Sequence, residues 1–198
     1  MSSIMPKSGT MAALLLILCS FPTCSTRPHL VIHASEPLSV VLREMPAGYP
    51  SLAPFNYAHM ILPKEALTIL ESLNYDAGSM VPFSQGQRQR VFTEFQAEFL
   101  APELSKALNL ALPHEVAAFN VSDPEKPHRH TKGMAFVHGH ELHLIIEQPQ
   151  TPLYEGKQKS YQQQDSRWSL LLGDGQRHYT SRPDGTGTIT NWVIIPLL

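Results

Sequence analysis

Histidines give this sequence its densest group of chemically active side chains. Five of the ten lie between positions 128 and 143, namely His128, His130, His138, His140 and His143. Imidazole nitrogens bind zinc and copper, and Glu141 in the same stretch adds a carboxylate oxygen. A metal centre is therefore the first chemistry to consider, and the backbone decides which of these side chains can share an ion.

A glycine at position 139 predicts a tight β-hairpin in this stretch. Gly139 and His140 fit a two-residue loop, because a type II′ turn needs glycine at its first central position. The resulting register pairs Lys132 with Glu147 and gives the hairpin one wholly apolar face. That face consists of Ala135, Val137, Leu142, Leu144 and Ile146. The alternative loop, His138–Gly139, would place a lysine opposite an isoleucine, so we prefer the first register.

The same register selects the candidate metal ligands. His138 and His143 become diagonal neighbours on the polar face, Glu141 lies opposite His138, and His140 sits at the turn as a further ligand. Two imidazoles and a carboxylate are a known donor set for zinc, and copper also binds imidazole. The competing interpretation is a plain solvent-exposed face on which His138 and Glu141 form a weak pair.

Other catalytic signatures are missing from the sequence. It has no Gly-x-Ser-x-Gly motif, no Walker-type phosphate loop and no His-Glu-x-x-His. Both cysteines, Cys19 and Cys24, lie near the N-terminus, so a cysteine nucleophile is excluded beyond that point. A net charge of −2 gives no general attraction for nucleic acid. These observations favour a binding or scaffolding protein over an enzyme.

The N-terminus has the layout of an export signal. Lys7 precedes an apolar run from Met11 to Phe21, and small residues follow up to Ser25. As a helix this run spans about 16 Å, roughly half of a bilayer core, so a signal peptide is favoured over a membrane anchor. The mature protein is then expected outside the cytoplasm, without a disulfide.

Cys24 gives this leader a second interpretation. The leader, the cysteine and the following Ser-Thr-Arg-Pro segment resemble a bacterial lipoprotein, which implies acylation of Cys24 as the new N-terminus. The residues before it, Phe21, Pro22 and Thr23, depart from the usual leucine and small-residue pattern. Ordinary cleavage after Ser25 is the alternative. We expect a periplasmic protein anchored by lipid, or otherwise a secreted one, with an unknown envelope protein as partner.

Beyond the leader, residues 1–24, the pattern predicts helices followed by strands. A Pro-rich tether is predicted over residues 25–55, with one short strand at 38–43, and a single domain over 56–198. Helices are expected at 63–73 and 87–112, and strands at 55–62, 115–121, 131–138, 141–147, 167–172 and 188–195. The expected fold is α+β, with an N-terminal coil and two or three helices packed on an antiparallel meander of about four or five strands.

Overall fold

A computed structural model of the chain describes residues 29–50, 52–55, 60–78, 87–152, 168–182 and 186–197. The leader and Cys24 lie outside these residues. The described part forms ten strands and two helices. They are β1 (Leu30–Ser35), β2 (Leu38–Glu44), α1 (Pro63–Ser72), β3 (Asn74–Asp76), β4 (Arg88–Arg90), α2 (Glu94–Leu110), β5 (Glu115–Ser122), β6 (Arg129–His138), β7 (Glu141–Pro152), β8 (Ser169–Leu171), β9 (Arg177–Thr180) and β10 (Thr188–Pro196).

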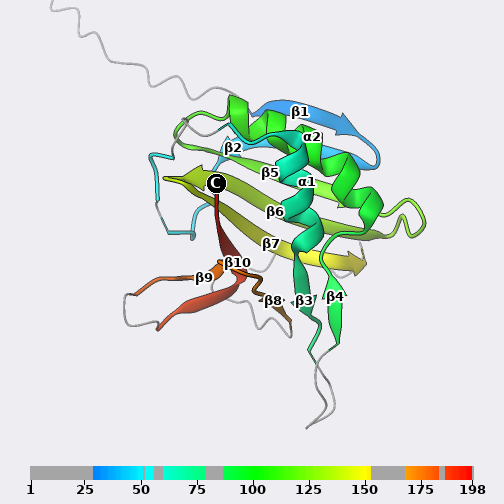
Figure 1. Cartoon of the computed structure of the whole chain (residues 1–198). Coiled ribbons are helices and arrows are strands. Elements are labelled where there is room, and N and C mark those ends of the chain that lie inside the picture. Colours follow the sequence, from blue (N-terminus) through cyan, green and yellow to red (C-terminus); the bar gives the residue numbers. More distant parts are fainter. Residues whose placement is uncertain are drawn as a thin grey trace, which may run out of the picture.

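Most strands belong to one antiparallel sheet of seven, in the order β1-β2-β5-β6-β7-β10-β9. A second sheet of three strands has the order β4-β3-β8. Helices α1 and α2 pack against each other and cover one face of the large sheet (Figure 1). The fold is therefore mostly β. The expected arrangement of two or three helices on a meander of about four or five strands is wrong, because strands outside the meander extend it and build a second sheet.

The segment predicted as a Pro-rich tether contains β1, which was not expected, and β2, which confirms the short strand predicted at 38–43. Alternation in β2 places Leu38, Val40 and Leu42 in the core beneath the helices. Pro37 lies in the turn between β1 and β2, where the missing amide hydrogen does not interrupt strand pairing. The prolines of this segment thus punctuate the strands without preventing them. The strand expected at 55–62 is absent from its described residues, 55 and 60–62.

Helix α2 begins later than the sequence pattern predicts. Residues 88–90 form β4, and the helix starts after Thr93, whose hydroxyl accepts from the Gln96 amide while the Gln96 side chain accepts from the Thr93 amide. This reciprocal capping box satisfies two amides at the helix start. Pro102 lies inside the helix on its exposed side, so α2 is one helix.

The other face of the large sheet is apolar at one end. Residues 45–50 and 52–55 pass across it, and a second hydrophobic cluster forms beneath them. Phe55 packs on Phe136 with ring centroids 4.4 Å apart, and Tyr49 meets Trp192 edge to face at 6.4 Å. The sheet is therefore buried on both faces at this end. Its cluster consists of Phe55, Val116, Met134, Phe136, Ile145, Trp192 and Ile194.

Gly133 in β6 has no room for a side chain. A Cβ atom there would meet the Ile145 carbonyl oxygen and lie 2.6 Å from Cζ of Phe119. We expect Gly133→Ala to lower the free energy of unfolding by about 2 kcal/mol, because a packed core must shift to admit the methyl group. Denaturant unfolding measures this. Gly173→Ala is the control, since its Cβ would make only ordinary contacts with Gln176. Equal stability of both variants would contradict the packing described for Gly133.

Candidate functional site

The predicted hairpin register is confirmed around its turn. Phe136 pairs with His143 and His138 with Glu141, and Gly139 has φ 64, a value that favours glycine. Further from the turn, an extra residue in β7 shifts the register, so that Lys132 pairs with Gln148 and not with Glu147.

The face that carries the candidate ligands is not open to solvent at His143. That side chain is only 3% exposed. Its ring stacks on Phe136 with centroids 4.8 Å apart and meets Trp192 edge to face at 5.9 Å. One signal of this burial is visible in the sequence, because Met134, Phe136 and Ile145 occupy the face that we expected to be polar. Trp192 from β10 completes the enclosure.

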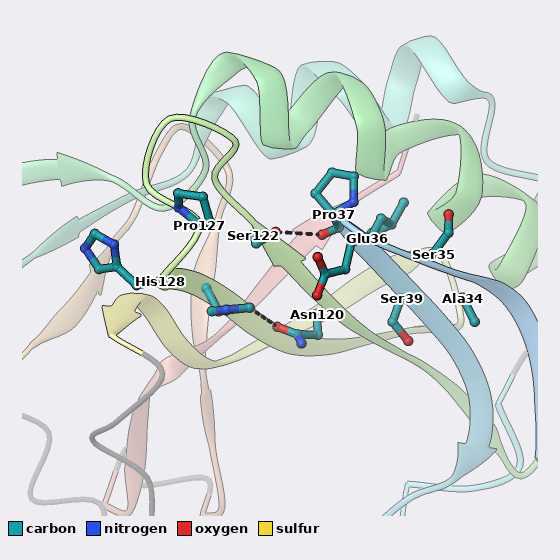
Figure 2. A pocket seen from close by; sticks show the side chains of 11 residues that line it. Ala34, Ser35, Glu36, Pro37, Ser39, Asn120, Ser122, Pro127 and His128 are labelled. Atoms are coloured by element: carbon teal, nitrogen blue, oxygen red, sulfur yellow. Dashed lines mark hydrogen bonds between the residues drawn. The ribbon is translucent and has the colours of Figure 1, made fainter.

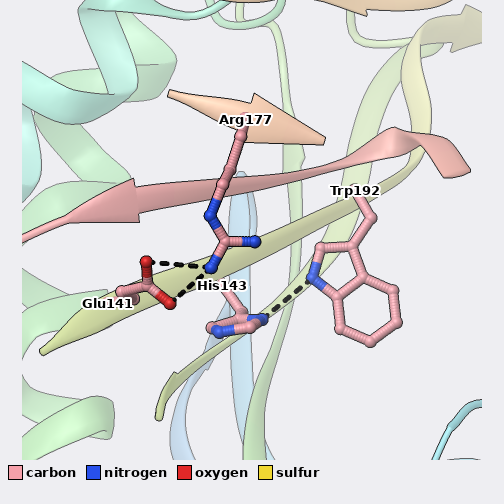
Figure 3. A network of polar contacts seen from close by, with 4 residues as sticks. All are labelled: Glu141, His143, Arg177 and Trp192. Atoms are coloured by element: carbon pink, nitrogen blue, oxygen red, sulfur yellow. Dashed lines mark hydrogen bonds and ion pairs between the residues drawn. The ribbon is translucent and has the colours of Figure 1, made fainter. Parts of the chain in front are cut away.

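A hydrogen bond fixes the proton of the His143 ring. The Trp192 indole Nε1–H donates to His143 Nδ1 at 3.2 Å (Figure 3), so the ring proton of neutral His143 is on Nε2. That Nε2 is buried and has no partner among the described residues. Burial, followed by the nearby charges of His138 and Arg177, lowers the pKa of His143 to about 4. His143 is thus a neutral imidazole inside an aromatic cluster.

The remaining candidate ligands lie around this buried ring. His138 is exposed, and its ring centroid is 5.9 Å from that of His143. The Glu141 carboxylate accepts two hydrogen bonds from Arg177 Nη2, at 2.7 and 2.9 Å. His140 lies in the turn, where its carbonyl accepts from the Leu197 amide at 2.8 Å. The hairpin therefore brings His138, Glu141 and His143 near each other, but two of them have other partners.

These partners do not suit a metal ion. To bind through Nε2, His143 would have to carry its proton on Nδ1, facing the Trp192 N–H, which is also a donor. Glu141 would have to leave Arg177. Within the described ranges, no group of three or more histidine, cysteine, aspartate or glutamate side chains is placed to hold a metal ion.

A depression on the large sheet with a mixed polar and apolar lining is a second candidate site, and it was not predicted. It has a volume of about 540 Å³ and lies where the β1–β2 turn, β5 and the β5–β6 connection meet (Figure 2). Ser39, Asn120 and Ser122 contribute hydroxyl and amide groups, while Glu36 and His130 add a carboxylate and an imidazole. The sequence held no signal for it, because its residues come from segments far apart in the chain.

A smaller depression of about 300 Å³ continues the first one. Both are lined by Ser39 and Asn120, so together they form a trough across β2 and β5. Arg43, Lys132 and Glu147 bring charges of both signs to the second part. Its wall includes Phe119, whose ring contacts Phe92 in the core on the helix side. The trough therefore combines polar groups with apolar walls that include Pro37 and Leu38, and among the described side chains it carries no aromatic stacking platform.

His130 contacts Asn120, and both side chains line the trough. Its Nδ1 lies 3.3 Å from Oδ1 of Asn120, and this is the dashed contact that ends at the labelled Asn120 in Figure 2. Burial, and then the charge of Lys132, lower the pKa of His130, so the ring is neutral near pH 7. A hydrogen bond with the Pro127 backbone also engages this ring, so His130 is held among the lining residues by contacts with both Asn120 and Pro127.

One arrangement beside the trough has the order of a hydrolytic triad. Ser35 Oγ is 2.8 Å from His33 Nε2, and His33 Nδ1 is 4.0 Å from Glu103. The histidine–glutamate distance is too long for a hydrogen bond, and the carboxylate also pairs with Lys106 at 3.8 Å. Ser35 is exposed at the end of edge strand β1. A catalytic base needs to be oriented and shielded from water, and this contact provides neither.

Comparison with known proteins adds no family. No family model matches the sequence, and neither the curated proteins nor the solved structures include a significant match. In the part of the chain that the structure covers, neither helix has the length and apolar character needed to cross a membrane. The functional argument therefore rests on the residues themselves.

The buried His143 predicts a specific dependence of stability on pH. Its pKa is about 4 in the folded protein, below the ordinary histidine value of 6.5, so the unfolded chain takes up the proton first as the pH falls. The contribution of His143 is fully present above pH 6.5 and declines toward pH 4, by about 3 kcal/mol in total.

Urea unfolding from pH 7.5 to pH 4 measures this decline. We expect His143→Gln to flatten the profile, because the amide does not titrate in this range. His138→Gln, which removes an exposed imidazole from the same hairpin, serves as the control and keeps most of the slope. A His143→Gln profile parallel to the wild type would show that the ring is not held neutral by burial.

Proposed function

We propose that this chain is an exported accessory protein that works by binding and not by catalysis, with the trough on its large sheet as the binding surface. The observation that carries this proposal is the pair of adjoining depressions joined by Ser39 and Asn120. Side chains on paired strands hold a fixed spacing, and such a surface can present hydrogen-bonding groups without rearranging. The N-terminal leader pattern supports export.

The chemistry of the trough indicates its ligand. Hydroxyl, amide and neutral imidazole groups offer both donors and acceptors, while Lys132 and Glu147 supply opposite charges at one end. These groups suit a polar ligand rich in hydroxyl and amide groups, such as an oligosaccharide of amino sugars. A shallow, open surface buries little of its ligand, so the binding is expected to be weak, with a Kd of about 1 mM.

Retention at a membrane is the second part of the proposal. An acylated Cys24 would hold the domain at the surface of the envelope, where it would meet such a polymer. Cleavage after Ser25 would instead release the same binding domain. The structural support for the metal alternative is weaker, because the Trp192 hydrogen bond and the Arg177 ion pair occupy two of its donors. Calorimetric zinc titration of the wild type and of a His138→Ala/His143→Ala variant tests that alternative.

Titration with an N-acetylglucosamine tetramer tests the binding surface. In ¹H–¹⁵N correlation spectra we expect the amide signals of Ser39, Asn120 and Lys132 to shift with the sugar. The Asn120→Ala variant should lose about tenfold in affinity, equivalent to about 1.4 kcal/mol, because one polar side chain at the junction of the depressions is removed.

The control replaces Asn109, an exposed amide on α2 outside the trough, with alanine and should bind like the wild type. Shifts confined to other surfaces, or no shifts up to 10 times the expected Kd of about 1 mM, would contradict the proposal. So would covalent labelling of Ser35 by a fluorophosphonate, because it would show that the serine is an activated nucleophile.

A further inference from the structure

Large apolar side chains are exposed at the end of the sheet where β1 begins. Met60 is 71% exposed, Leu62 60% and Leu110 49%. Met60 and Leu62 flank Ile61, whose carbonyl oxygen accepts from Ser105 at 2.7 Å and from Asn109 at 3.4 Å. Leu110 follows Asn109 in the last turn of α2. The three side chains, which we call the β1-end patch, therefore lie around one stretch of backbone.

Strand register places this patch beside the start of the described chain. Leu30 in β1 pairs with Leu42 near the end of β2, and Leu42 pairs with Ala117 near the start of β5. Four residues connect Leu110 to Glu115 at the start of β5. The beginning of β1 and the end of α2 accordingly lie at the same end of the molecule (Figure 1).

The length of chain between Cys24 and β1 limits how far the start of β1 can lie from an anchor at Cys24. Five residue steps separate Cys24 from His29 and reach at most about 18 Å when fully extended. Strand β6, with ten residues, is about 33 Å long. An anchor at Cys24 would thus keep the start of β1 within about 18 Å of its attachment point, whereas the opposite end of the sheet is under no such limit.

We propose that the β1-end patch rests on the lipid surface to which an acylated Cys24 attaches the protein. Exposed methionine and leucine side chains at such a boundary enter the region between headgroups and acyl chains. The lipid chain provides the attachment, and the patch sets the orientation, so that the domain sits with its β1 end down. This inference rests on the proposed anchor.

Oxidation of Met60 reports on the patch without any label. The full chain is expressed with its leader, extracted from membranes and reconstituted in phosphatidylcholine vesicles, and the Cys24→Ser chain in solution is the reference. Both are treated with hydrogen peroxide, which converts exposed methionine to its sulfoxide. We expect Met60 to oxidise at least about fivefold more slowly on vesicles. Peptide mass spectrometry reads the oxidation.

Two further variants distinguish protection of Met60 by lipid contact at the patch from shielding of the whole domain by the vesicle. Leu172 is a matched exposed leucine next to β8, at 46% exposure, so the methionine introduced by Leu172→Met should oxidise at the same rate with and without vesicles. Leu62→Glu combined with Leu110→Glu should restore fast oxidation of Met60 while the protein still sediments with the vesicles. Both substitutions lie at exposed positions that folding tolerates.

The outcomes distinguish the anchor from the patch. Mass spectrometry of the mature N-terminus shows whether Cys24 is acylated, and an unmodified cysteine overturns both the anchor and this inference. With acylation present, equal oxidation of Met60 on vesicles and in solution overturns the patch and leaves the anchor standing. Equal protection of the position 172 methionine also overturns it, because the whole domain would then be shielded.

Discussion

The pairing of Phe136 with His143 across the β6–β7 hairpin determines what each face of the large sheet carries. Side chains alternate along a strand, so a shift of one residue would exchange the two faces completely. In the observed register, Ala135 and Leu144 face the helices, and Phe136 and His143 face the residues that cross the opposite side. The turn at Gly139 fixes this register, and the positions of the other strands follow from it.

The second face of the sheet is consequently divided into two unlike halves. At one end, residues 45–50 and 52–55 close it over Phe136 and Trp192, and His143 is included as a neutral ring that accepts from the indole. At the other end, the side chains of Ser39 and Asn120 line an uncovered trough. The same alternation that buries His143 therefore presents polar groups a few strands away, on the same rigid backbone.

Part of this arrangement was predictable from local patterns. The glycine at the hairpin turn and the run of apolar residues at every second position specified the register near Gly139. The helix-facing core also followed from alternation. Strand β9 was not predictable, because it is a short, partly exposed edge strand whose composition resembles that of a loop. Strand β1 does begin with the strand-like run Leu30-Val-Ile32, but the prolines on both sides of it favoured an irregular tether. The enclosure of His143 was missed because Trp192 and residues 45–55 are distant in sequence, and the trough was missed for the same reason.

The division of the second face can be measured directly, because the sequence beyond Cys24 contains no cysteine. In a Cys19→Ser/Cys24→Ser background, Ser39→Cys and Val116→Cys place single thiols on the same face, on neighbouring strands β2 and β5. Ser39 lines the trough, whereas Val116 is fully buried under the crossing residues. Maleimide labelling should proceed readily at position 39 and only after unfolding at position 116. Similar labelling rates for the two native variants would contradict a face that is open at one end and closed at the other.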